Sequence, residues 1–491
     1  MEPQAQESPT QLLSAWRGLA EGMGTVLAEY EEWWRAEGCA ISAAVDRQGT
    51  PGLQIHDRFG EPEDRILYTP EYRRMLERGY RAGVVARTAE EGSLLPGYEL
   101  GYVTSFFDPG LYCPYTVSLG TLLPLLKYGS PQLQERFVPA MTRRDGEVWQ
   151  GATWMTEAGG GSDLGRQVRT RARCEAGSWH LHGDKYFCSN VDAELAVVAA
   201  RPEGARPDVR GLALFLVPRW RADGTLNYRI RRLKDKIATR SVPTGEVILA
   251  DSEAWLLGEH EQGIYLIMEV LNSSRVANSV GAVALLQRAI AEACTFARGR
   301  EVFGTALLEQ PLFRQQLNEW REELRTSFAL AWEAAEWLDA VWRQEPPYSE
   351  SYHVFRLLAH LAKLYTADRA VAAARWAMEI HGGAGALHEY PPERLLREAM
   401  ILGIWEGTPH RQILDGIAVM ERTRAHERLF AHLGEPAGAT VLRERIEALL
   451  AASRDEREAG AEAVFHELAR WTGTELARRR LPPVEGACGV Q

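Results

Sequence analysis

The sequence predicts an α+β protein, mainly α, in which a β domain separates two helical parts of the chain. Helical periodicity marks the first part, and short β-branched or aromatic runs alternate with Gly, Asp and Pro turns from about residue 149 to 255. The helical period returns in long segments after about residue 260. The length of 491 residues suggests two to four domains or one large multi-layer subunit.

Each part of the chain has its own pattern. Residues 1–60, an N-terminal extension, carry one amphipathic helical stretch followed by a Gly/Pro-rich connection, and residues 61–148 form an N-terminal helical domain with turn breaks. The strand spacing within residues 149–255 predicts a β-barrel or a sandwich. Residues 256–425 predict a helical bundle, and residues 426–491 a helical C-terminal extension, a helical pair with a loose Pro/Gly tail.

Composition excludes several classes of protein. Hydrophobic residues make up 45% and charged residues 25%, which is ordinary globular composition. The six cysteines are scattered without a C-x-x-C pair, which argues against a zinc ribbon or a disulfide framework, and we expect no metal site. The net charge of −11 disfavours a general polyanion-binding surface. Without a membrane-length apolar run or a signal-like start, we expect a cytoplasmic protein.

The stretch "IWEGTPHRQ" (404–412) places Glu406 between a tryptophan and a glycine. Thr408 and Pro409 predict the start of a helix, because Thr offers a capping oxygen and Pro suits the first helical position. On local chemistry alone, Glu406 is either an exposed acid at a helix start or a base aimed into a pocket.

Two stretches of the β domain carry residues suited to a phosphate or a flat ring. In "WMTEAGGGSDLG" (154–165), three glycines before Ser162 allow a nest of N–H groups for a diphosphate, although a plain β-turn is equally favoured. Leu164 replaces the last glycine of G-x-G-x-x-G and no βαβ pattern surrounds it, which disfavours a Rossmann site. In "GDKYFCSN" (183–190), Phe187 either packs against a flat ring, with Ser189 or Ser162 bonding to it, or belongs to the core.

Two further motifs lie in the helical bundle. In "FARGREVFG" (296–304), Arg300 offers bidentate phosphate binding and Phe303 a surface beside an adenine or flavin ring. An arginine at a helix end also serves the helix dipole. The turn "EIHGGAG" (379–385) is either a helix stop or a close approach of backbone to a ligand.

Together and in this order, the motifs resemble the acyl-CoA dehydrogenase superfamily. The matching stretches, "MTEAGGGSD", "RGREVFG", "EIHGGAG…EYPPERLLREA" and "IWEGT", belong to a likeness that spans most of residues 65–425. The stretches "RLKDKIATRS", "WLLGEHEQGI" and "EQPLFRQQL", the tryptophan before "EGT" and both terminal extensions resemble the AidB-like branch, the alkylation-response proteins.

The resemblance implies a middle β-barrel, a C-terminal four-helix bundle, non-covalently bound FAD and a homotetramer or dimer. The residues at the cofactor positions are Met155, Thr156, Gly161, Ser162, Phe187, Ser189, Arg300, Phe303, Gln310, Glu379, Gly382, Gly383 and Thr408. Four positions depart from the common pattern. Phe187 and Ser189 stand where many relatives have Trp and Thr, Glu379 replaces a common glutamine, and Gln310 falls one position early.

The resemblance also implies the activity. Glu406 falls at the catalytic-base position, and the alternative base position, before Arg275, holds Ser274, which is not an acid. Ser162 and Arg275 are expected at the substrate. The implied reaction is α,β-dehydrogenation of an acyl thioester, carried by CoA or a carrier protein, with an electron-transferring flavoprotein as a candidate partner.

Two other functions stay open on this scaffold. A DNA-associated damage-response role would need a basic C-terminal surface, but residues 422–491 hold 11 arginines and 11 acids, so DNA binding is not favoured. A flavin oxidase or monooxygenase is the other alternative, and an acid at position 406 argues against it.

Overall fold

The computed structural model describes residues 7–483 and divides them into two compact units. The barrel unit contains residues 36–100 and 110–274. The bundle unit contains the described residues up to Arg35, residues 101–109 and the residues from Arg275 onward. Each unit therefore assembles segments that lie far apart in the sequence.

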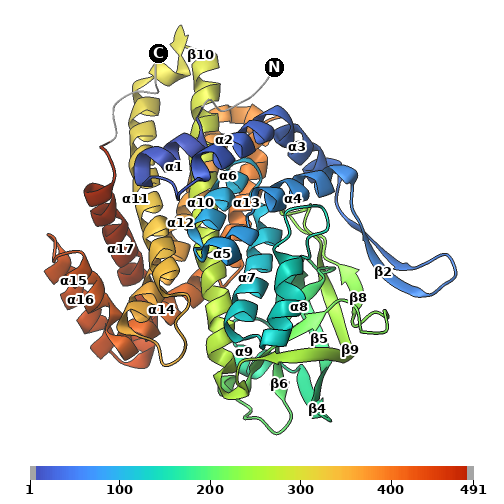
Figure 1. The fold of residues 1–491 in the computed structure, drawn as a ribbon. Helices are drawn as coiled ribbons and strands as arrows, with labels where there is room; N and C mark the ends of the chain where they lie inside the picture. Colours follow the sequence, from blue (N-terminus) through green and yellow to red (C-terminus); the bar gives the residue numbers. More distant parts are fainter. Residues whose placement is uncertain (1–6, 484–491) are drawn as a thin grey trace. The chain divides into compact units, whose positions relative to one another are not determined.

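The barrel unit is built on seven strands, five of which close into a ring. The strands are β3 (Gly151–Trp154), β4 (Arg171–Glu175), β5 (Ser178–Ser189), β6 (Leu195–Pro202), β7 (Ala213–Pro218), β8 (Arg229–Leu233) and β9 (Thr244–Leu257). The ring runs β4–β5–β9–β7–β6 and returns to β4, while β3 pairs with β6 and β8 with β9. The closed ring confirms the barrel and rules out the sandwich (Figure 1).

The central strands of the barrel read as continuous apolar runs because both of their faces are covered. All residues of β6 and β7 are buried. Val198 and Phe215 are paired across these two strands, and both belong to the barrel core together with Val247. Burial of such side chains contributes about 1.5–3 kcal/mol each, so this core is the main source of the unit's stability.

The barrel unit also holds helices, and they confirm the predicted N-terminal helical domain. They are α3 (Cys39–Gln48), α4 (Pro70–Ala82), α5 (Ala86–Glu91), α6 (Leu95–Phe107, whose residues from Gly101 onward belong to the bundle unit), α7 (Tyr112–Tyr128), α8 (Pro131–Met141) and the short α9 (Leu164–Gln167). α7 packs against β3. There the Ser118 hydroxyl accepts a hydrogen bond from the Gly151 N–H at 2.9 Å and contacts the Tyr80 hydroxyl at 2.8 Å.

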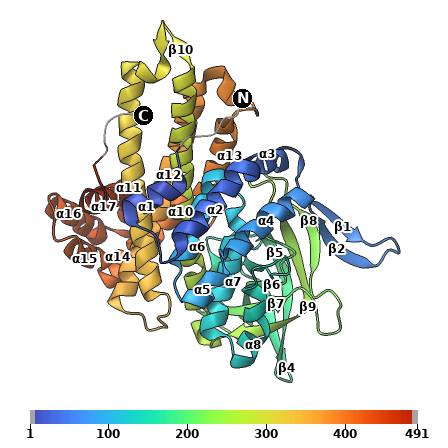
Figure 2. The same ribbon diagram turned by 45° about the horizontal axis from the view of Figure 1, so that its top comes forward.

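A β-hairpin replaces the irregular connection expected near residue 60. Its strands are β1 (Gly52–His56) and β2 (Pro62–Leu67), and Figure 2 shows the hairpin projecting at the edge of the view. The Asp57 carboxylate accepts the N–H groups of Phe59 and Glu61 at 2.7 and 3.0 Å, and Gly60 takes a φ of 87°. These are ordinary turn devices, so the sequence did contain the signal.

The expectation of one N-terminal helical stretch is wrong. The chain forms α1 (Pro9–Arg17), α2 (Met23–Trp33) and a π-helical turn (Trp34–Gly38) that leads into α3. Gly18 and Gly22 take φ values of 75° and 74°, which a right-handed helix cannot contain. The two glycines therefore divide the stretch.

Long helices form the bundle unit, as predicted. They are α10 (Gly263–Gly299, whose first residues belong to the barrel unit), α11 (Pro311–Val341), α12 (Glu350–His381), α13 (Pro391–Ile404) and α14 (Pro409–Thr423). α12 packs against α11, α13 and α14. A small hairpin, β10 (Glu301–Val302) and β11 (Thr305–Ala306), joins α10 to α11 at their far end (Figure 1).

Among the described residues, one helical segment, His260–Gly299, is long and apolar enough to cross a membrane. However, 89% of its most apolar window is buried inside the protein. Arg288 and Glu292 lie buried on the same helix and form an ion pair at 2.6 Å. These features match the core helix of a folded protein.

The C-terminal extension is helical, as expected, but holds three helices in place of a pair. They are α15 (Ala425–His432), α16 (Ala439–Ala451) and α17 (Arg454–Arg480). α17 packs along α11 and α12, so the extension adds a layer to the bundle unit. The last part of the predicted tail, residues 484–491, lies outside the described residues.

Candidate active site

Glu406 lies in the tight turn between α13 and α14. Its φ of 58° is in the left-handed region, and Gly407 follows with a φ of 106°. For a residue with a side chain, this conformation costs about 1–2 kcal/mol. The turn must therefore be held by its surroundings, which is typical of a functional position.

Side chains from three helices hold the backbone of this turn. Arg275 of α10 donates from Nε to the Glu406 carbonyl at 3.0 Å. Gln412 of α14 donates from Nε2 to the carbonyls of Glu406 and Gly407, both at 3.0 Å. His360 of α12 contacts the Gln412 Oε1 through Nδ1 at 2.9 Å and fixes the amide orientation. Arg275 thus supports the turn, and its expected contact with substrate stays a prediction.

Burial and nearby positive charge have opposite effects on the pKa of the Glu406 carboxyl. It retains some solvent exposure in this chain, yet burial raises the pKa of its carboxyl to about 7, against the lowering effect of Arg275 and Lys363. Arg275 is 2% exposed and Lys363 is 1% exposed. A carboxyl with such a pKa changes charge near neutral pH, which suits a group that must accept a proton.

The residues beside Glu406 are also fixed. The Trp405 indole N–H donates to the Asn278 side-chain oxygen on α10. α14 begins at Pro409 with Thr408 at the N-cap, as predicted, but the Thr408 side chain makes no capping hydrogen bond. The expectation that Thr408 supplies a capping oxygen is therefore wrong, and its expected contact with the cofactor stays a prediction.

In the barrel unit, Phe187 is not a core residue. Its ring is 57% exposed on β5, next to Tyr186. The Lys234 ammonium lies 5.3 Å from the Phe187 ring centre. Two residues further along, the Ser189 hydroxyl contacts the Thr244 hydroxyl at 3.1 Å. An exposed aromatic face beside hydroxyl groups can receive a flat heteroaromatic ring.

The glycine-rich turn follows β3 in the same unit. Met155 is buried, and the Thr156 carbonyl accepts the Tyr186 N–H at 3.0 Å, which ties the start of the turn to β5. A Cβ added to Gly161 would lie 2.5 Å from the Thr156 hydroxyl oxygen, so a larger residue there would displace the Thr156 side chain. Ser162 is exposed at the end of the turn. The structure thus brings Met155, Thr156, Gly161 and Ser162 beside the strand of Phe187.

A buried ion pair that the sequence analysis missed supports this turn. The Lys185 ammonium donates to the Glu157 carboxylate at 2.8 Å and to the Ala199 carbonyl at 2.7 Å. The same carboxylate accepts the Thr170 hydroxyl at 2.6 Å and the Arg169 N–H at 2.7 Å. Burial raises the pKa of Glu157, but the Lys185 charge and these hydrogen bonds outweigh burial and keep the pKa below its usual value.

The predicted arginine and phenylalanine at the α10–α11 connection are exposed. Arg300 is exposed, and Phe303, at a φ of 51°, has no protein covering its ring. Gln310 donates to the Thr305 hydroxyl at 2.6 Å and to the Val302 carbonyl at 3.3 Å, so its amide holds the small hairpin. In the described part of the chain, no hydrogen bond or ion pair joins these three residues to the Glu406 turn.

At the end of α12, Gly382 takes a φ of 57° and terminates the helix, and Gly383 beside it is exposed. Glu379 is exposed and accepts a hydrogen bond from Arg375 at 2.8 Å. The helix-stop interpretation of this turn is therefore confirmed. The approach of a ligand to these residues stays a prediction.

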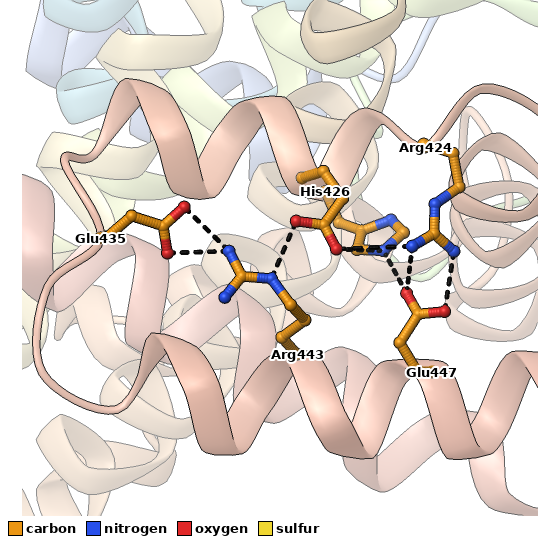
Figure 3. Close-up of polar contacts among 6 residues, drawn as sticks. Arg424, His426, Glu435, Arg443 and Glu447 are labelled. Carbon is orange, nitrogen blue, oxygen red and sulfur yellow. Dashed lines mark hydrogen bonds and ion pairs between the residues drawn. The ribbon is translucent and has the colours of Figure 1, made fainter.

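Several arginines of the C-terminal extension form ion pairs with carboxylates. Figure 3 shows a network around α15 and α16, made of Arg424, His426, Glu427, Glu435, Arg443 and Glu447. Arg424 binds the Glu447 carboxylate at 2.8 Å, and Arg443 binds the Glu435 carboxylate at 2.7 Å. Ligand atoms of His426, Glu427 and Glu447 lie within 4.8 Å of one another, but the two arginines already supply the positive charge there.

Three family models match most of the described chain, up to residue 421. Residues 7–147 match the adaptive response protein AidB N-terminal domain, residues 152–252 the acyl-CoA dehydrogenase middle domain, and residues 261–421 the acyl-CoA dehydrogenase C-terminal domain. The putative acyl-CoA dehydrogenase AidB of Escherichia coli is 32% identical over 76% of this chain and 69% of its own length. Acyl-CoA dehydrogenase family member 11 of Caenorhabditis elegans is 31% identical over 75% of this chain. The match spans 62% of that relative's own length.

Solved structures share this fold. Bd2924 in its apo form superposes with a TM-score of 0.87 at 27% identity, over 96% of both chains. Caenorhabditis elegans ACDH-11 in complex with C11-CoA superposes with a TM-score of 0.79 at 25% identity, over 98% of this chain and 91% of that one.

Proposed function

Because the chain belongs to the acyl-CoA dehydrogenase family, whose members are FAD-dependent oxidoreductases, we propose that it dehydrogenates an acyl thioester between Cα and Cβ. Glu406 is the base that takes the α-proton. The observation that carries this assignment is the left-handed Glu406 turn, which hydrogen bonds from the buried Arg275 and Gln412 hold in place. The C11-CoA bound to ACDH-11 supports acyl-CoA as the substrate class, and a carrier-bound acyl group is the second form.

The residues of the barrel unit fit FAD. The exposed Phe187 ring offers a flat apolar wall, and the hydroxyls of Thr156, Ser162 and Ser189 offer hydrogen bonds at its edge. Bound FAD supplies the acceptor for the β-hydrogen. Arg300, Phe303, Glu379, Gly382 and Gly383 are exposed and Gln310 is half-buried, so these groups are accessible to the cofactor of a neighbouring subunit.

The proton step rests on this chain's own residues. The α-hydrogen of a thioester is weakly acidic, so its removal needs a positioned base and stabilisation of the enolate. When the Glu406 carboxylate takes the proton, the C–H electron pair stays on the substrate as the enolate. Burial favours the neutral acid that forms, whereas Arg275 and Lys363 keep the carboxylate accessible near pH 7.

Anaerobic mixing of the FAD-loaded protein with acyl-CoAs of short, medium and long chain tests this function. We expect bleaching of the oxidised flavin absorbance by at least one acyl-CoA. The matching free fatty acids, which lack the acidifying thioester, serve as controls and leave the spectrum unchanged. If no thioester, CoA-bound or carrier-bound, bleaches the flavin, the proposed dehydrogenase function is wrong.

The proposal includes assembly as a homotetramer or dimer in the cytoplasm, with an electron-transferring flavoprotein as reoxidant. The uncovered Phe303 ring supports assembly, because an exposed aromatic at a hairpin tip is a natural contact for a second copy. Sedimentation velocity of the FAD-loaded protein tests the assembly, and a monomer at micromolar concentration would contradict it. Rapid flavin reoxidation by oxygen would instead favour the oxidase alternative.

A DNA-associated role receives less support than the dehydrogenase. In the C-terminal extension, Arg424 forms an ion pair with Glu447 and Arg443 with Glu435, so neighbouring glutamates offset both positive charges (Figure 3). Binding to duplex DNA is measured over a range of salt concentrations, because affinity for phosphates falls steeply with salt. We expect no binding near physiological salt, and binding there would restore this alternative.

A further inference from the structure

Lys363 is a buried lysine in the middle of α12, facing the Glu406 turn. Its ammonium donates to the Gly403 carbonyl at 2.9 Å and to the Gly407 carbonyl at 2.7 Å. Gly403 belongs to the last turn of α13, and Gly407 directly follows Glu406. One side chain thus binds the backbone on both sides of the left-handed residue.

The charge of Lys363 is unusual for its position. Among residues 7–483, no carboxylate lies within ion-pair distance of its ammonium, although the side chain is 1% exposed. A buried ammonium without an ion-pair partner is destabilising unless it serves a purpose. A glutamine or a methionine would fill an α-helical position of this kind without that penalty.

The electrostatic link of Lys363 is to Glu406. Burial and the Arg275 charge lower the pKa of Lys363, the Glu406 carboxylate opposes them, and the pKa settles at about 7. In return, the Lys363 charge lowers the pKa of Glu406. The other charged or titratable groups that face this region are Arg275 on α10, Arg356 and His360 on α12, and Arg411 and Asp415 on α14.

We propose that Lys363 is the positioning residue of Glu406. Its ammonium clamps the Gly403 and Gly407 carbonyls, which keeps residue 406 left-handed, and its positive charge favours the ionised carboxylate over the neutral acid. This inference rests on the proposed function and deepens it. Arg275 holds the same turn from α10 and Lys363 from α12, so the base is fixed from two sides.

Three substitutions separate the two roles of Lys363. Lys363→Gln keeps N–H donors and removes the charge, Lys363→Arg keeps both, and Lys363→Met removes both. Lys127→Met is the matched control, because the Lys127 ammonium is also poorly exposed but binds Glu269 on another helix. Each FAD-loaded variant is mixed anaerobically with a bleaching acyl-CoA from pH 5.5 to 9.5.

We expect the charge-deficient Lys363→Gln to move the apparent pKa of bleaching upward by about 1 unit, with a plateau rate within a few-fold of the wild type. Lys363→Met shows the same shift and a plateau at least about tenfold lower, because residue 406 loses its clamp. Lys363→Arg and Lys127→Met keep the wild-type pH profile. Unshifted profiles for both Gln and Met would overturn the proposal.

A second measurement works without turnover. Infrared difference spectra recorded during a pH titration contain a carboxyl band, which Glu406→Gln identifies by its loss. We expect this band to titrate at higher pH in Lys363→Gln than in the wild type, and an unchanged midpoint refutes the charge role. The infrared titration needs no substrate, so it tests the role of Lys363 even if no thioester bleaches the wild-type flavin. Failure of the proposed function can therefore be distinguished from failure of this inference.

Discussion

Removal of the Lys185 ammonium is the sharpest test of what holds the glycine-rich turn. Lys185 and Glu157 form a buried pair, with side-chain exposures of 0% and 7%. Lys185→Met has a similar length and leaves the Glu157 carboxylate without its counter-charge. The carboxylate still accepts hydrogen bonds from Thr170 and Arg169, which fixes it in place and prevents it from turning toward solvent.

The expected loss of stability in Lys185→Met is large. Breaking a buried ion pair by removing one partner costs about 3–5 kcal/mol, because the remaining charge is desolvated and unpaired. For a unit of this size, 1 kcal/mol corresponds to about 2–4 °C in melting temperature, so we expect a drop of roughly 6–20 °C. Glu157→Gln removes the stranded charge, and the Glu157→Gln/Lys185→Met double variant should recover part of that loss.

Thermal unfolding of the four FAD-loaded proteins, wild type, both single variants and the double variant, measures this coupling. FAD retention is followed in parallel by gel filtration, since the pair anchors the turn that carries Gly161 and Ser162. We expect the double variant to be more stable than Lys185→Met alone. A Lys185→Met protein that melts within about 2 °C of the wild type, a loss of only about 1 kcal/mol, would refute the reasoning.

Three other predictions follow from the site. Gly161→Ala, whose Cβ would lie 2.5 Å from the Thr156 hydroxyl oxygen, should lower FAD affinity at least about tenfold in a fluorescence titration, and unchanged affinity would contradict the close approach. Phe303→Ala, at a ring without protein contacts, should leave far-UV circular dichroism unchanged but weaken assembly in sedimentation velocity, and an intact oligomer would argue against a contact there. The wild-type bleaching rate should rise with pH through about 7 and then level, because the base must be ionised and burial raises the pKa of Glu406; a pH-independent rate would exclude Glu406 as the titrating base.

Much of the fold is visible in the sequence because periodicity reports it directly. The order of helices, strands and helices is confirmed, and Gly382 ends α12 where the glycine pair predicts. The strand pattern alone did not decide between barrel and sandwich, because the choice depends on β6 pairing with both β7 and β4, and fully buried runs carry no register information; the family resemblance implied the barrel. The β1–β2 hairpin and the break at Gly18 were missed although turn residues marked both.

The candidate site was also only partly visible in the sequence. Glu406, Phe187 and the glycine turn were singled out by residue type and local pattern, and the family resemblance gave them their expected roles. Their supports were not, because Lys185 lies 28 residues from Glu157 and Lys363 lies 44 residues from Gly407. A lysine within a helix reads as a solvated side chain until tertiary packing shows that it is buried. The left-handed conformation of Glu406 was equally hidden, since the adjacent glycine is the expected place for a positive φ.

Single-turnover reduction of the flavin in Glu406→Gln, compared with the wild type under anaerobic conditions and with the same acyl-CoA, tests the central claim most directly. Glutamine keeps the size and hydrogen-bonding capacity of the side chain but cannot take the α-proton. We predict that the variant retains FAD and binds the acyl-CoA, while its bleaching rate falls at least about 100-fold. Bleaching at the wild-type rate would show that Glu406 is not the base.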